Sequence, residues 1–130
     1  MIKELDITTR QKNEFIDITE EINLLLVGIK EGICIIYVPH TTAALTINEN
    51  ADPDVTDDIL KHLSKMVPDS SGYKHSEGNS SAHIKSSIVG CSQTVIIKNG
   101  KLLLGSWQGV MFCEFDGPRQ RKVIVKVVEK

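Results

Sequence analysis

The chain has 130 residues, of which 41% are hydrophobic and 25% charged, and its 15 basic and 17 acidic residues give a formal net charge of −2. This length suits a single domain over residues 1–130, and the charge argues against a protein that binds nucleic acid electrostatically. No stretch approaches the ~20 apolar residues of a membrane span, and the N-terminus lacks the apolar stretch of a secretory signal. The three cysteines form no CxxC pair, so we expect free thiols and a cytoplasmic location.

Apolar periodicity and turn residues divide the chain into about eight strands and three helices, which do not alternate regularly and so predict an α+β fold. The run 33–38 is continuously apolar, which predicts a strand buried on both faces. Asn99-Gly100 is a hairpin signal. In chain order the patterns predict strands over 2–9 and 15–18, a helix over 20–29, strands over 33–38 and 41–48, helices over 53–66 and 82–89, and strands over 94–97, 101–104, 110–115 and 123–128.

The ends of the three predicted helices carry residues that suit capping. Thr19 is placed to cap the first helix, and Gly32 suits its exit. The pair Asp52-Pro53 is a strong helix start, because aspartate caps well and proline fits the first helical position. Ser80 or Ser81 can cap the third helix.

The segment from His75 to His83 is the first candidate site, because it gathers two histidines, Glu77 and Asn79 in nine residues. Three interpretations are open. The two histidines, with a third ligand elsewhere, could hold a divalent metal that keeps one position for substrate. One histidine could instead act as general acid or base, since imidazole titrates near neutrality. Alternatively, this is a solvated loop in which His83 only caps or packs against a helix.

A helix N-terminus overlaps this segment. Gly78, Asn79, Ser80 and Ser81 lead into the predicted third helix, whose free backbone N–H groups and positive dipole end suit a phosphate. The two serine hydroxyls would add donors. Many helices begin with glycine or serine and bind nothing, so the pattern alone does not establish a phosphate site.

A second polar segment runs from His40 to Asp52. His40 follows Pro39 at the end of an apolar strand, where a side chain leaves the core at a defined place. Glu49 and Asp52 could bind a metal or an ammonium group, although residues 48–52 also suit a turn and a helix cap.

The C-terminal part offers fewer candidates. Trp107 could stack on a flat heterocycle or belong to the core, and residues 116–118 form a turn. Arg119 could bind a phosphate bidentately or lie in solvent. We interpret the basic cluster Arg119, Arg121 and Lys122 as a solvated strand end.

Three long segments resemble the signatures of the YjbQ-like family. They are HTTAALTINENADPDV at 40–55, HSEGN continuing through AHIKSS at 75–87, and LLLGSWQG with CEFDGPR at 102–119. The likeness runs over essentially the whole chain in order, and motifs of this length are highly specific. One departure is Cys91-Ser92, where the family pattern leads us to expect Pro-Ser.

The resemblance implies a fold, an assembly and an activity. It implies a compact α+β domain with a mixed or antiparallel, sandwich-like sheet of about eight strands and about three helices. It further implies a homotrimer with sites near subunit boundaries. Members are described as secondary thiamine-phosphate synthases, which join a pyrimidine diphosphate to a thiazole phosphate and release pyrophosphate, while the primary role of the family is unsettled.

The resemblance and the residue chemistry together give the expected site. We expect a small phosphorylated heterocyclic substrate and a divalent metal, Zn or Mg, held by His40, His75 and His83. The alternative is a metal- or small-ligand-binding protein without significant turnover. The expected catalytic residues are His40, Glu49, His75, Glu77 and His83, and the expected substrate or phosphate contacts are Thr41, Asn48, Asp52, Gly78, Asn79, Ser80, Ser81, Trp107, Gln108 and Arg119.

Overall fold

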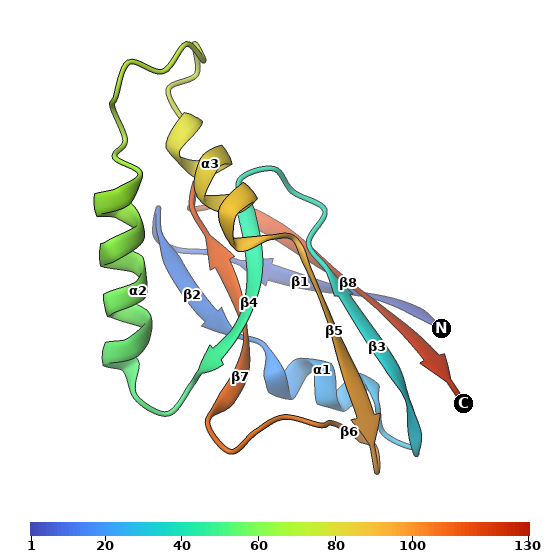
Figure 1. Ribbon diagram of the computed structural model, residues 1–130. Helices are drawn as coiled ribbons and strands as arrows, with labels where there is room; N and C mark the ends of the chain where they lie inside the picture. The colour runs from blue at the N-terminus through green and yellow to red at the C-terminus, as the bar shows by residue number, and fades with distance from the viewer.

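The computed structural model describes residues 1–130 and contains eight strands and three helices in two sheets (Figure 1). In chain order they are β1 (Ile2–Thr8), β2 (Glu14–Asp17), α1 (Thr19–Leu25), β3 (Glu31–Tyr37), β4 (Ala43–Glu49), α2 (Pro53–Met66), α3 (Ser80–Val89), β5 (Ser92–Lys98), β6 (Lys101–Leu102), β7 (Gln108–Glu114) and β8 (Gln120–Glu129). The larger sheet has the order β1-β8-β3-β5-β6 and the smaller one β2-β7-β4. All paired strands are antiparallel, and the predicted α+β class is confirmed.

The two sheets and α1 enclose the larger of two clusters of buried apolar side chains, and this cluster is largely aliphatic. Alternate strand residues point inward, as the two-residue period of a strand requires. Ile36 of β3 and Val125 of β8 are buried in this way, and Phe112 of β7 joins them from the smaller sheet. Ile22 and Leu26, in and just after α1, pack against the same cluster.

Strand β3 is buried on one face only, so the prediction that both faces are buried is wrong. Cys34 and Ile36 point into the core, while Ile33, Ile35 and Tyr37 are exposed on the outer face of the larger sheet. The alternation of buried and exposed residues could not be predicted from the sequence, because both faces of the strand are apolar. The larger sheet therefore carries an apolar strip on its outer face.

Helix α1 is shorter than predicted, and Thr19 is not its cap. Thr19 is the first helical residue, and its backbone N–H and its hydroxyl both donate to the Asp17 carboxylate, at 2.9 and 2.6 Å. The helix ends before Gly28, which has a φ of 90° and makes the exit turn predicted for Gly32. Gly32 lies in β3 instead, where a Cβ would collide with the backbone oxygen of Val128.

The other two helices follow their predicted ranges closely. The carboxylate of Asp52 accepts the backbone N–H of Asp54 at 2.9 Å, which confirms the predicted start of α2. Helix α3 begins with Asn79 at its N-cap, so the cap predicted for Ser80 or Ser81 is wrong. Figure 1 shows α3 lying beside β4, and contacts between them hold it there.

All three cysteines are free, as predicted. Cys34 and Cys113 are buried and Cys91 is exposed. Burial raises the pKa of the Cys34 thiol to about 11 and raises the pKa of Cys113 as well. None of the helices has the length and apolar character needed to cross a membrane.

Candidate functional site

A cavity of about 490 Å³ opens where the β3–β4 connection, the start of α3 and the β7–β8 connection meet. Apart from one proline, no residue with a wholly apolar side chain lines it. We call it the polar pocket, and its lining residues are Pro39, His40, Thr41, Thr42, His75, Glu77, Asn79, His83, Asp116, Arg119 and Arg121.

Arg121 lines the polar pocket and forms a buried ion pair with Glu114, which lies behind the lining; we call this pair the floor of the polar pocket. Nε of Arg121 donates to Oε1 of Glu114 at 2.8 Å and Nη2 donates to Oε2 at 2.5 Å, with side chains only 5% and 0% exposed. Nη2 also donates to the hydroxyl oxygen of Thr42 at 2.9 Å, and the Thr9 hydroxyl donates to Oε1 of Glu114 at 2.7 Å. This bidentate geometry fixes the guanidinium plane.

Both groups of the pair stay charged despite their burial. Burial alone raises the pKa of Glu114, but hydrogen bonds from Arg121, Thr9 and the backbone N–H of Asp116 outweigh burial and hold that pKa below its ordinary value. Arginine is protonated at every relevant pH. Nη1 of Arg121 has no hydrogen-bond partner in the protein and is not sealed from solvent, so its two N–H groups remain available to an anion in the pocket.

Asp116 holds Arg119 at the rim of the polar pocket. Nε of Arg119 donates to the carbonyl oxygen of Asp116 at 2.8 Å, and Nη2 donates to its carboxylate at 2.9 Å. The side-chain amide of Asn79 donates to the same carboxylate at 2.9 Å. Burial raises the pKa of Asp116, but the hydrogen bonds from Asn79 and Arg119 outweigh it and leave the pKa below its ordinary value.

His40 is held as a neutral ring. Its Nε2 accepts the backbone N–H of Lys122 at 2.9 Å, which leaves Nδ1 to carry the proton. Burial lowers the pKa of His40, and the positive charge of Arg121 lowers it further, against the opposing effect of Glu114. His40 therefore suits the role of a hydrogen-bond donor through Nδ1.

His75 and His83 lie close together but do not complete a metal site. Their ring centroids are 5.4 Å apart at an interplanar angle of 89°, and a Glu77 carboxylate oxygen lies 4.0 Å from Nε2 of His75. No group of three or more His, Cys, Asp or Glu side chains is arranged to hold a metal ion, and Nε2 of His40 is already engaged by Lys122. These residues do not fit the predicted three-histidine site, and they are placed instead to exchange protons or hydrogen bonds with a bound molecule.

A second set of predicted site residues lies away from the polar pocket, at the opposite end of β4. That strand covers about 20 Å between Ala43 and Glu49 at roughly 3.3 Å per residue. The Glu49 carboxylate accepts the backbone N–H of Asp52 at 3.2 Å, and Asp52 caps α2, so both serve the turn between these elements. The residues that the structure leaves outside the pocket in this way are Asn48, Glu49, Asp52, Trp107 and Gln108.

The predicted phosphate cradle at the start of α3 is only partly in the polar pocket. Asn79 lines the pocket, but Gly78, Ser80 and Ser81 do not. The hydroxyl of Ser81 donates to the carboxylate of Asp69 at 2.9 Å and so anchors the loop before the helix. The N-terminal end of α3, with its positive dipole, still adjoins the pocket through Asn79.

Sequence reasoning missed Glu114, Asp116 and Arg121. The interpretation of Arg121 as part of a solvated strand end is wrong, because this side chain is buried. A signal was available: Arg121 shares its alternation with Val123 and Val125 of β8, so it faces inward with them. Glu114 likewise ends the buried strand β7, and an inward arginine needs a carboxylate partner.

The fold and the pocket define a small α+β protein with an arginine–glutamate pair under a polar cavity. The chain belongs to the family described as UPF0047 protein YjbQ-like, whose model matches residues 3–130. It is 55% identical over 130 residues to a UPF0047 protein of Methanocaldococcus jannaschii, covering 98% of this chain and 94% of the relative. It is 52% identical over 131 residues to UPF0047 protein YugU of Bacillus subtilis, covering 98% and 99%.

Solved structures carry the same fold. A crystal structure of an uncharacterised YjbQ/UPF0047 family protein from Clostridium acetobutylicum has a TM-score of 0.94 at 54% identity, covering 97% of this chain and 99% of that one. A protein of unknown function from Sulfolobus solfataricus has a TM-score of 0.94 at 31% identity, covering 100% and 97%. The family membership indicated by the three motifs is thus confirmed.

Proposed function

We propose that the polar pocket binds the phosphate groups of a small phosphorylated heterocycle, and that the protein has a weak, secondary thiamine-phosphate synthase activity. The observation that carries the proposal is Arg121, a guanidinium that Glu114 fixes in the pocket floor with Nη1 left unpaired. Arg119 supplies a second guanidinium at the rim. Two fixed guanidinium groups in one polar cavity suit a phosphate or a diphosphate.

The proposed reaction needs charge neutralisation more than proton removal. The thiazole nitrogen forms a bond to the methylene carbon of the pyrimidine, while the carbon–oxygen bond to the diphosphate breaks and its electron pair leaves with pyrophosphate. The ring nitrogen becomes positive, and no proton has to be abstracted. Arg119 and Arg121 would stabilise the negative charge on the leaving group, and His75 or His83 in its protonated form would donate to the departing oxygen.

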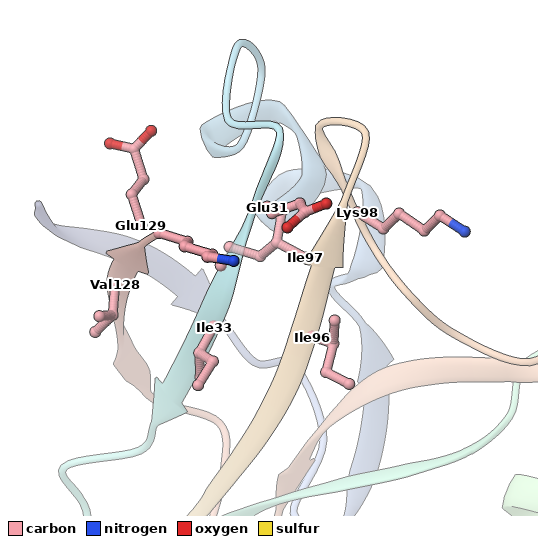
Figure 2. Close-up of a pocket in the computed structure, with 9 residues that line it drawn as sticks. Glu31, Ile33, Ile96, Ile97, Lys98, Val128 and Glu129 are labelled. Atoms are coloured by element: carbon pink, nitrogen blue, oxygen red, sulfur yellow. The ribbon is translucent and has the colours of Figure 1, made fainter.

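A homotrimer is part of this proposal, and the apolar strip on the larger sheet supports it. The strip extends across three strands, because Ile33 of β3 pairs with Ile96 of β5 on one side and with Val128 of β8 on the other. All three side chains are exposed (Figure 2). Charges of both signs, including Lys98 and Glu129, border them. An exposed apolar strip with mixed charges at its edge suits contact with another copy of the chain.

Pyrophosphate binding tests the proposed phosphate pocket. The test compares the replacement of a basic residue in the pocket with that of an equally exposed basic residue outside it. Arg119 and Lys122 have side chains that are each 52% exposed, but only Arg119 lines the polar pocket. In isothermal titration calorimetry, Arg119→Ala should weaken pyrophosphate binding at least about tenfold, the size expected for hydrogen bonds to a charged group. Lys122→Ala should change it by less than about twofold. Equal losses in the two variants, or no binding to the unaltered protein, would contradict the proposal.

Activity and assembly are measured separately. At least one of the variants His75→Ala and His83→Ala should abolish formation of thiamine phosphate, and neither should change the molar mass seen by light scattering. Full activity in both variants would overturn the catalytic assignment. Pyrophosphate binding without product would identify the alternative, a ligand-binding protein without significant turnover, and elemental analysis would detect a stoichiometric metal.

The proposal includes a location in the reducing cytoplasm, and the three free thiols fit that location.

A further inference from the structure

A second cavity of about 350 Å³ adjoins the polar pocket. The two share a wall made of His40, Thr41 and His83. The second cavity, which we call the inner chamber, is open to solvent at Ser87 and Cys91 and is completed by Ala43, Ser86 and Gly90. Apart from the histidines of the shared wall, none of its lining residues carries an ionisable side chain other than the thiol of Cys91.

One face of α3 runs along both cavities. The residues on this face are spaced by four, three, one and three positions, which places them in one stripe along the helix. They are Asn79, His83, Ser86, Ser87 and Gly90. The first two line the polar pocket and the last four line the inner chamber. The stripe is about 16 Å long at ~1.5 Å per residue, and it faces the connection from β3 to β4.

Two buried polar atoms on this stripe have no partner, one beside each cavity. They are Oδ1 of Asn79 at the polar pocket and Oγ of Ser86 in the wall of the inner chamber. Ser86 is only 8% exposed, and folded proteins rarely leave such an atom unpaired. Rotation about χ1 alone moves a serine hydroxyl between its staggered positions, so Ser86 can present its hydroxyl to a molecule in the chamber.

We infer that the two cavities form one elongated site that binds a phosphorylated molecule along α3. The phosphate lies at the N-terminal end of the helix, where Arg119 and Arg121 are, and an uncharged end with hydrogen-bonding atoms, such as a nitrogen heterocycle, lies in the inner chamber against Ser86. The direction follows from the charges, since both arginines and the positive helix end are at the polar pocket. This inference rests on the proposed phosphate pocket and adds the place of the uncharged part.

Ser86→Ala provides the first test. Removing a buried hydroxyl that has no partner should leave the free energy of unfolding unchanged or higher. The affinity for 4-methyl-5-(2-phosphooxyethyl)thiazole, measured by calorimetry, should fall about threefold to tenfold with the loss of one hydrogen bond. The affinity for inorganic pyrophosphate, which occupies only the polar pocket, should stay within about twofold.

Cys91→Trp tests the chamber without touching a buried residue, because Cys91 is exposed. The larger side chain should block the inner chamber and weaken thiazole phosphate binding by at least about tenfold, while pyrophosphate binding stays within about twofold. Alkylation of Cys91 in the unaltered protein should block the chamber in the same way and give the same two results. If pyrophosphate binds but neither variant alters thiazole phosphate binding, the inner chamber is not part of the site and this inference fails. If pyrophosphate does not bind the unaltered protein, the proposed phosphate pocket fails and this inference fails with it.

Discussion

Replacing Glu114 by glutamine tests the ion pair on which the polar pocket is built. The carboxylate has no exposed surface, and it accepts two hydrogen bonds from Arg121, one from Thr9 and one from the backbone N–H of Asp116. Glutamine keeps the shape but removes the counter-charge and sets an NH₂ donor against the donors of Arg121. Leaving one member of a buried pair uncompensated costs roughly 3–5 kcal/mol. We expect Glu114→Gln to lower the free energy of unfolding by that amount.

Urea unfolding, with every variant at the same protein concentration, measures this loss. Lys12→Ala is the control, because it removes the surface pair with Asp69, whose side chains are 52% and 59% exposed. Such a pair is worth only about 0.2–1 kcal/mol. A loss in Glu114→Gln no larger than that of Lys12→Ala would refute the assignment of Arg121 and Glu114 as the anchored floor of the pocket.

The stability difference between the unaltered protein and Glu114→Gln should also depend on pH, and the direction of that dependence is a second test. The pKa of Glu114 is lower in the folded protein than its ordinary value of 4.5, so the unfolded chain binds the proton more tightly. The stabilisation is therefore complete above pH 4.5 and is lost as the pH falls through the folded-state pKa. The difference in stability between the unaltered protein and Glu114→Gln should shrink in that acid range, and a difference that grows there would contradict the argument.

Three further predictions concern local structure. Asp52→Ala should lower the free energy of unfolding by about 1 kcal/mol through loss of the α2 cap, and an unchanged urea midpoint would show that the cap contributes nothing. Gly32→Ala should cost about 1–3 kcal/mol in the same assay, because the added Cβ meets the backbone oxygen of Val128; a neutral result would mean that β3 and β8 can move apart without cost. In the native protein at neutral pH, iodoacetamide should modify Cys91 alone, and mass spectrometry showing more than one adduct would contradict the burial of the other two thiols.

The sequence by itself determined the local features of this protein. The Asp52-Pro53 start of α2 could be read directly, because a cap depends on residues two or three positions apart. The Asn99-Gly100 turn between β5 and β6 was equally clear, since both residues adopt positive φ there. The alternation of buried and exposed residues in β8 also predicts that Arg121 faces inward. Its charge alone led to the wrong interpretation of a solvated strand end.

Only the tertiary structure decided which polar residues share a site. His40 and Glu49 lie in one continuous sequence motif, yet the extended strand β4 places them at opposite ends. His40, His83 and Arg121 are far apart in sequence, and they meet because the β3–β4 connection, α3 and β8 converge at one end of the sheets. Contacts of this kind depend on strand order and on burial against partners distant in the chain, which no local pattern encodes.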